Sequence, residues 1–102
     1  MILYRIYNKK REKEYIGIEF GKKFVEDKIF NKHRTEKINE ELHKDLNTMP
    51  HHVFDIKVLN KSKNSKTIEK LEENYVENSE NCYNTGDSLI KNIFNINRDA
   101  KR

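Results

Sequence analysis

Two short apolar runs, each containing a tyrosine, lie near the N-terminus on either side of a strongly polar stretch. The first run, residues 2–4, ends at Tyr4, and the second, residues 15–17, begins at Tyr15. β-Branched and aromatic residues favour strands, and a short polar segment between two such runs is typical of a hairpin turn. A turn centred between residues 9 and 10 would place the two tyrosines directly opposite each other. The sequence therefore predicts a β-hairpin with its two phenol groups side by side.

The rest of the chain alternates between helical and extended patterns. We expect strands at residues 2–7, 14–20 and 53–59, helices at 22–33, about 35–46 and 67–78, and a short helix after Gly86 that Asp87 or Ser88 caps. In the helix at 35–46, Thr35 is the expected cap, and Ile38, Leu42 and Leu46 recur every four residues. In the second strand, Ile16, Ile18 and Phe20 alternate. These elements predict a small three-stranded antiparallel sheet flanked by three helices, an α/β (α+β) fold. Residues 1–86 would form one domain, and residues 87–102 a C-terminal helix and basic tail.

Composition and charge limit the classes of function. The chain has 102 residues, of which 34% are hydrophobic and 37% are charged, enough for one domain with a modest core. The net charge is +4, and positive side chains cluster in residues 9–13, 22–34 and 57–66. Such clusters suit a phosphate backbone, although a solvated lysine-rich surface is the alternative. The residues that we expect to contact nucleic acid are Lys9, Lys10, Arg11, Lys23, Lys28 and Arg34.

The cysteine count and the hydropathy pattern indicate where such a chain resides. Cys82 is the single cysteine, which excludes an intramolecular disulfide and a site of several thiolates. The N-terminal apolar run ends at Arg5, too short for a signal peptide. No apolar run is long enough to cross a membrane. We therefore expect an intracellular protein, cytoplasmic or nuclear, with no membrane partner.

Glu72 is the carboxylate that the helical pattern singles out. The apolar stripe of the expected helix at 67–78 consists of Ile68, Leu71, Tyr75 and Val76. Glu72 projects on the same side, between Ile68 and Val76. A carboxylate on a stripe that faces the core needs a partner or a metal ion. The alternative is a glutamate at the edge of the stripe that pairs with a nearby lysine or caps a hydrogen-bond network.

The order and spacing of these motifs resemble the GIY-YIG nuclease domain. Leu3-Tyr4 matches the end of the family's first motif, although Ile2 stands where members have glycine, and Tyr15-Ile16-Gly17 matches the second motif in full. His33 falls where many members carry a histidine at the end of the next helix. Further matches are Asn39 and Leu42, the strand VFDIKVL, the helix segment LEENYV with Glu72, and the closing Tyr83-Asn84. The resemblance covers about residues 1–86.

The resemblance implies a hydrolase that cleaves phosphodiester bonds with one divalent ion, Mg²⁺ or Mn²⁺. Glu72 would be the metal ligand, since its carboxylate is a hard oxygen donor. Tyr4 would orient the attacking water or act as a general base, which requires nearby cations to lower its pKa. Tyr15 would hydrogen-bond the phosphate or Tyr4. His33 would accept a proton or contact the phosphate, and Asn84 would hold the site together.

Other positions qualify this picture. Gly17 fits a position where a side chain would crowd the site. The family usually has an arginine four residues before the helix-end histidine, and this position is Ile29 here. The residues that can replace that arginine are Lys23, Lys28 and Arg34. For either tyrosine, the alternative is an ordinary half-buried strand aromatic. His51 and His52 are adjacent and point in opposite directions on a strand, so we expect exposed loop histidines rather than a metal pair.

The sequence thus favours a divalent-metal-dependent endonuclease acting on DNA, with double-stranded DNA as its partner. The main alternative is a module of the same fold that binds nucleic acid without cleaving it. A third hypothesis is a protein-interaction domain that forms a homodimer through Ile90, Ile93 and Phe94.

Overall fold

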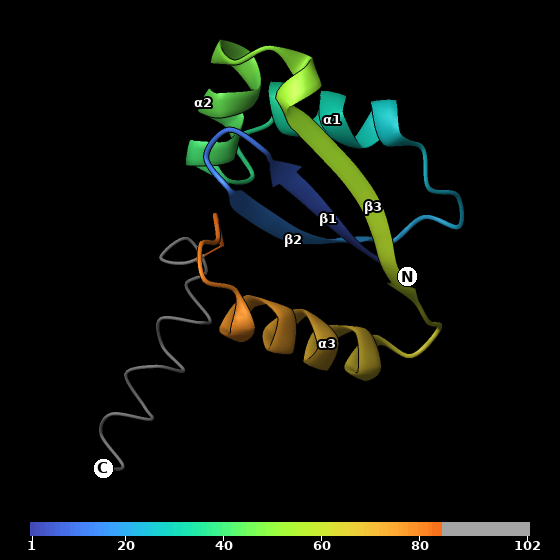
Figure 1. Cartoon of the computed structure of the whole chain (residues 1–102). Helices are drawn as coiled ribbons and strands as arrows, with labels where there is room; N and C mark the ends of the chain where they lie inside the picture. Colours follow the sequence, from blue (N-terminus) through green and yellow to red (C-terminus); the bar gives the residue numbers. More distant parts are fainter. Residues whose placement is uncertain (85–102) are drawn as a thin grey trace.

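The computed structural model describes residues 1–84. Its elements are β1 (Ile2–Asn8), β2 (Lys13–Glu19), α1 (Glu26–Thr35), α2 (Glu40–Thr48), the 3-10 turn η1 (His51–Val53), β3 (Phe54–Lys61) and α3 (Ser65–Asn78). The three strands form one antiparallel sheet in the order β2-β1-β3. Helices α1 and α2 cover one face, and α3 covers the other (Figure 1). The expected α+β fold is confirmed. The predicted C-terminal helix and the dimer residues Ile90, Ile93 and Phe94 lie outside the described residues.

Alternation along β1 divides the interior into two clusters. Tyr4 and Ile6 pack toward α1 and α2, where they meet Phe30 and Leu46. Leu3 points to the opposite face and packs with the residues of the second cluster, Ile16, Ile68, Val76 and Cys82. Successive side chains of a strand point to opposite faces, so the central strand supplies both cores. Tyr4, the first expected site residue, therefore lies on the face of α1 and α2.

The register of the hairpin differs from the expected one by two residues. Tyr4 pairs with Gly17, and Tyr15 pairs with Ile6. The turn is longer than expected, because the Asn8 side-chain oxygen Oδ1 accepts hydrogen bonds from the backbone N–H groups of Lys10 and Arg11 at 3.0 and 3.1 Å. A shift of two keeps every side chain on its face. The tyrosines are diagonal neighbours, with ring centroids 6.3 Å apart.

The first two helices begin later than the sequence predicted. Helix α1 starts at Glu26, and residues 20–25 form an irregular connection. Thr35 does not cap α2; it ends α1, and its hydroxyl donates to the Asn31 carbonyl. The cap of α2 is Asn39, whose side-chain oxygen accepts from the Leu42 N–H at 2.9 Å. Ile38 therefore lies outside the helix and is 46% exposed.

Helix α3 starts two residues earlier than expected, because Asn64 caps it by accepting from the N–H groups of Lys66 and Thr67. Ile68 and Val76 are buried, as the stripe predicted, but Tyr75 is 38% exposed and does not belong to the stripe.

No helix within residues 1–84 is long and apolar enough to cross a membrane.

Residues 81–84 are tied to the outer edge of β2. The N–H of Glu14 donates to the Asn81 carbonyl, and the N–H of Tyr83 donates to the Glu14 carbonyl. One step further, the Asn84 side chain pairs with the backbone of Ile16 through both its oxygen and its nitrogen, at 2.9 and 2.8 Å. An exposed strand edge is thereby satisfied. The end of the described chain thus holds β2 in place beside Tyr15 and Gly17.

A buried polar network anchors the same segment from the other side. The Tyr83 hydroxyl donates to Asp45 at 2.7 Å and accepts from the Asn8 amide at 2.9 Å. Asp45 is 1% exposed, and Arg11 approaches it at 3.3 Å. A buried carboxylate is tolerated when it is paired and hydrogen-bonded. The network therefore joins the hairpin turn, α2 and the segment after α3.

Candidate functional site

Tyr4 and His33 form the centre of the candidate site. Tyr4 comes from β1 and His33 from the last turn of α1, and both are buried. The Tyr4 hydroxyl lies 2.8 Å from Nε2 of His33, within hydrogen-bond distance. Nδ1 of His33 is buried and has no hydrogen-bond partner among residues 1–84. The sequence predicted both residues for the site, and the fold brings them together across 29 positions.

Gly17 makes this arrangement possible. A Cβ atom at position 17 would lie 2.4 Å from Tyr4 Cζ, 2.5 Å from the Tyr4 hydroxyl and 2.8 Å from Tyr15 Cε2. All three distances are shorter than van der Waals contact between carbon or oxygen atoms. The Tyr4 ring therefore lies over β2 in the space that any other residue would fill. The expectation of a crowded position at Gly17 is confirmed.

Tyr15 completes an aromatic cluster around His33. Its ring centroid lies 4.8 Å from that of His33, with the planes at 71°, an edge-to-face contact. Tyr15 is only partly buried. Asn84, another predicted site residue, lies after α3 and bonds the strand rather than the rings. It bonds the backbone of Ile16, between Tyr15 and Gly17, and so acts on the site through the strand.

Glu72 lies on α3, in the helix layer that covers the opposite face of the sheet from α1 and α2. It is half-buried on α3, and its charge contributes to the field at Tyr4. No residue within 1–84 donates a hydrogen bond to Glu72 or forms an ion pair with it, so the lysine partner considered above is not found there. Burial, and then the charges of Glu73 and Glu69, raise the pKa of Glu72. A carboxylate in this state gains from a cation beside it.

The local charges act on Tyr4 in the direction opposite to the one expected. The pKa of Tyr4 is raised well above its usual range. Burial is the largest cause, and the charges of Tyr15, Glu19 and Glu72 add to it. Tyr4 is therefore a neutral phenol at physiological pH. Burial also lowers the pKa of His33 to about 4, with a further contribution from the Lys32 charge. The pair is thus a neutral phenol against a neutral imidazole.

The predicted basic residues fall into two groups. In the hairpin turn, Lys9 lies 3.8 Å from Asp55 and Arg11 lies 3.3 Å from Asp45, so part of this charge is balanced. Lys10 is exposed in the same turn. The second group, beside α1, consists of Lys23, Lys28 and Arg34. Lys23 and Lys28 are exposed, whereas Arg34 stacks over the Phe30 ring and contacts His51.

The residue at the position where GIY-YIG nucleases usually have an arginine lies in the core. Ile29 is 2% exposed and packs in the cluster that contains Tyr4. An arginine side chain there would have no route to solvent without displacing neighbours. His51 and His52 are exposed in η1, as the sequence predicted. Within residues 1–84, no group of three or more His, Cys, Asp or Glu side chains is placed to hold a metal ion together.

Two residues near Tyr4 were not anticipated. The Phe24 ring lies 6.0 Å from the Tyr4 ring, and Glu19 acts on the phenol electrostatically. Phe24 was expected inside a helix, so its approach to Tyr4 depends on where α1 begins. Glu19 could have been found from the sequence, since it lies two residues after Gly17 on the same side of the strand. The charges of two carboxylates, Glu19 and Glu72, therefore act on the Tyr4 phenol.

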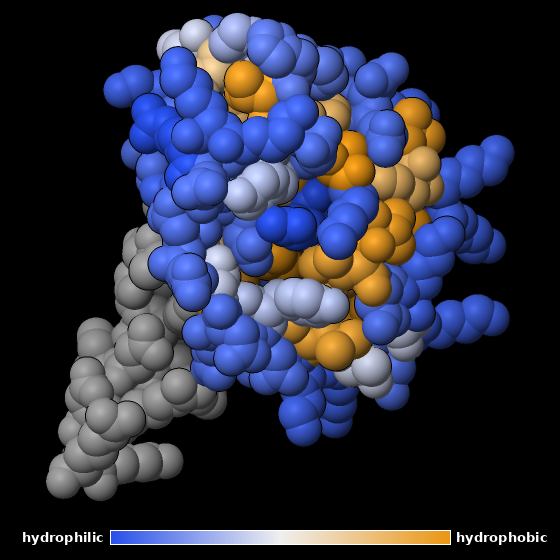
Figure 2. All heavy atoms as spheres, in the orientation of Figure 1, coloured by the Kyte–Doolittle hydropathy of each residue, from blue (hydrophilic) through white to orange (hydrophobic). Residues whose placement is uncertain are grey.

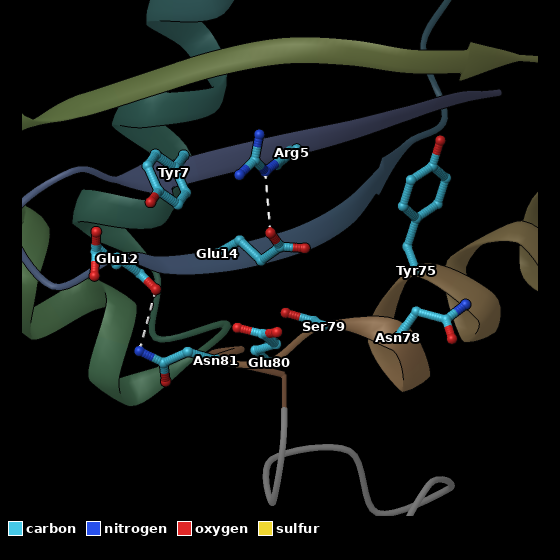
Figure 3. Close-up of a pocket in the computed structure, with 9 residues that line it drawn as sticks. All are labelled: Arg5, Tyr7, Glu12, Glu14, Tyr75, Asn78, Ser79, Glu80 and Asn81. Carbon is cyan, nitrogen blue, oxygen red and sulfur yellow. Dashed lines mark hydrogen bonds and ion pairs between the residues drawn. The ribbon is translucent and has the colours of Figure 1, made fainter.

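A separate groove lies between the C-terminal half of α3 and the strands β1 and β2. Its volume is about 530 Å³, and it is lined by Arg5, Tyr7, Glu12, Glu14, Tyr75, Asn78, Ser79, Glu80 and Asn81 (Figure 3). Arg5 binds Glu14 at 3.2 Å and stacks over the Tyr7 ring. None of the residues predicted for catalysis lines this groove.

No protein-family model, curated protein or solved structure matches this chain. The site is therefore interpreted from its own residues.

Gly17→Ala should destabilise the fold and disrupt the contact between Tyr4 and His33. The new methyl group would overlap Tyr4 and Tyr15, so one ring must leave its place and the contact between Tyr4 and His33 is lost. Overpacking of this kind costs about 1–3 kcal/mol, which urea unfolding would measure. Gly21→Ala is the matched control, because its Cβ would lie 3.4 Å from the Glu19 carboxylate, an ordinary contact. Equal stability of both variants would contradict the packing described.

His33 should make the fold sensitive to acid. Its folded pKa of about 4 lies below its unfolded value of about 6.5, so the unfolded chain binds the proton more tightly. The stabilisation is complete above about pH 6.5 and is lost as the pH falls toward 4, roughly 3 kcal/mol in all. Urea unfolding at several pH values would measure it. His33→Gln should flatten the dependence, and the exposed His52→Gln should not. An unchanged slope in His33→Gln would refute this origin.

Proposed function

We propose that this chain is a divalent-metal-dependent endonuclease that hydrolyses phosphodiester bonds in DNA. The observation that carries the proposal is the buried contact between Tyr4 and His33, 2.8 Å long, with the unpaired carboxylate of Glu72 acting on the same phenol. A neutral phenol, a neutral imidazole and a carboxylate supply the groups that water activation and metal binding need. The resemblance of the motifs to GIY-YIG nucleases supports the same reaction.

Tyr4 and His33 would act as a proton relay. The phenol pKa is raised, so Tyr4 cannot serve as a preformed phenolate. It can accept a proton from the attacking water if its own proton moves to His33 Nε2. This requires the tautomer in which Nε2 is unprotonated and Nδ1 carries the hydrogen. Tyr15, edge-on to His33 and partly exposed, would orient the phosphate through its hydroxyl.

Glu72 would hold the metal ion. Its half-buried carboxylate has a raised pKa and no cationic partner within residues 1–84, so a divalent ion fits its charge. The charge of Glu19 also acts on the Tyr4 phenol and supplements the negative field. When bound, the ion would stabilise charge on the scissile phosphate and the leaving oxygen. It would also offset the carboxylate charges that keep the Tyr4 proton in place.

The exposed lysines on and beside α1 would bind the phosphate backbone of the DNA. Lys23 and Lys28 project from the segment that begins next to β2 and from α1 itself. Lys10 supplies a further exposed charge at the hairpin turn. Cys82 is buried and forms no disulfide within residues 1–84, which suits an intracellular protein. We propose double-stranded DNA as the partner in that compartment.

One observation favours a second candidate, a module that binds nucleic acid without cleaving it. Ile29 is buried in the core at the position of the expected arginine, and Arg34 is engaged with Phe30 and His51. A phosphoryl-transfer site usually needs a cation to stabilise the transition state. In this second candidate, lysine contacts remain and the metal is not required.

Cleavage of supercoiled plasmid with Mg²⁺, Mn²⁺ or EDTA separates the two candidates. Wild-type protein should nick the plasmid only with a divalent ion, and Glu72→Gln should abolish nicking. The same variant should be more stable without metal at pH 7, because folding now leaves a partly desolvated charge unpaired. Thermal unfolding would measure that gain. Glu69→Gln, an exposed position on the same helix, is the matched control and should nick like wild type.

The outcomes are distinct. Nicking that survives Glu72→Gln would contradict the metal role of Glu72. Folded wild-type protein that shifts plasmid DNA but never nicks it would support the binding module. Protein that neither nicks nor binds DNA would contradict both candidates.

A further inference from the structure

Phe20 is the most exposed large hydrophobic residue within residues 1–84. It is 75% exposed and follows β2 directly, where the alternation of Ile16 and Ile18 had placed it on an apolar strand face. Ile16 is buried and Ile18 is half-buried, so the alternation holds until the strand ends at Glu19. An exposed aromatic ring loses the favourable transfer from water that burial provides. The exposed ring of Phe20 is therefore available to contact a partner.

The segment that carries Phe20 is tied to the candidate site. Its backbone turns at Gly21, whose N–H donates to the Glu19 carboxylate at 3.0 Å. Phe24, at the other end, turns inward and lies 6.0 Å from the Tyr4 ring. Between them Lys22 and Lys23 are both exposed. One short connection thus presents an outward ring and two ammonium groups beside the catalytic phenol.

The figures show the same feature at the level of the surface. The connection between β2 and α1 projects past the end of the sheet (Figure 1). In the same orientation, hydrophobic side chains gather on that side of the molecule, and hydrophilic side chains project around them (Figure 2). An exposed aromatic ring with two exposed lysines beside it suits a ligand that is flat and apolar on one part and anionic on another.

A nucleotide has this combination. An exposed base offers a π-face to an aromatic side chain, and its phosphate pairs with lysine. From Gly17 to Phe20 the chain advances three residues, about 10 Å of extended backbone. This corresponds to about three base steps at 3.4 Å each. A ring at that distance from Tyr4 would meet a base close to the bond that is cut.

We propose that Phe20 stacks on an unpaired base near the scissile phosphate, with Lys22 and Lys23 on the flanking phosphates. This inference rests on the proposed nuclease function and names its substrate class: DNA in which a base is unpaired or pushed out of the helix. In an uninterrupted duplex the bases stack on one another and offer no free face to Phe20. Continuous duplex DNA would therefore be held by lysine contacts alone.

Binding of two matched oligonucleotide duplexes tests this inference. One is fully paired, and the other carries a single bulged 2-aminopurine. Both are titrated with protein in EDTA, so that binding does not require cleavage. Wild-type protein should bind the bulged duplex more tightly and quench its fluorescence. Phe20→Ala should weaken binding to the bulged duplex about 5- to 150-fold and leave the paired duplex unchanged.

Two further variants make the test specific. Phe20→Trp keeps a stacking ring and should retain the preference for the bulge. Ile38→Ala removes another exposed apolar side chain, on the connection between α1 and α2, and should behave like wild type.

Equal affinities of Phe20→Ala and wild type for the bulged duplex would overturn the inference. So would self-association, seen by sedimentation, that Phe20→Ala abolishes, because the ring would then serve a second copy of the chain. Plasmid nicking is scored separately. If nicking requires metal but Phe20→Ala has no effect on binding, the nuclease proposal holds and the stacking inference fails. If Phe20 contributes to binding of the bulged duplex but no nicking occurs, the protein binds nucleic acid without cleaving it.

Discussion

Tyr4 can lie over β2 only because position 17 carries no side chain. The missing Cβ leaves room for the Tyr4 hydroxyl at the point where the last turn of α1 brings His33 within 2.8 Å. Asn84 closes the edge of the same strand and keeps Gly17 in register. Three distant parts of the chain therefore depend on one glycine.

Electrostatics give the site its chemical character. Burial raises the pKa of Tyr4 and lowers that of His33, so both groups are neutral. The charges of Glu19 and Glu72 add a negative field at Tyr4, and Glu72 forms no ion pair within residues 1–84. Such an arrangement stores unfavourable charge in the folded protein. A divalent ion would relieve it, and the same ion would make the Tyr4 proton easier to lose. Stability and activity should therefore oppose each other at Glu72.

The sequence predicts the sheet, the three helices and the clustering of Tyr4, Tyr15 and His33, because alternation and motif order are local properties. It misses the register by two residues, since the turn is set by the Asn8 side chain, which no periodicity reveals. Non-local contacts account for the other misses: Phe24 reaches Tyr4 only because α1 begins late. The sign of the field at Tyr4 depends equally on which charges the fold brings near.

Paramagnetic broadening by Mn²⁺ would test the central claim, that Glu72 binds a metal ion beside Tyr4. Titration of ¹⁵N-labelled protein with Mn²⁺ should broaden the Gly17 amide and the Tyr4 and Glu72 signals first, and Glu72→Gln should remove this selectivity. Broadening confined to other acidic positions such as Glu12 and Glu80, or unchanged by Glu72→Gln, would contradict the account.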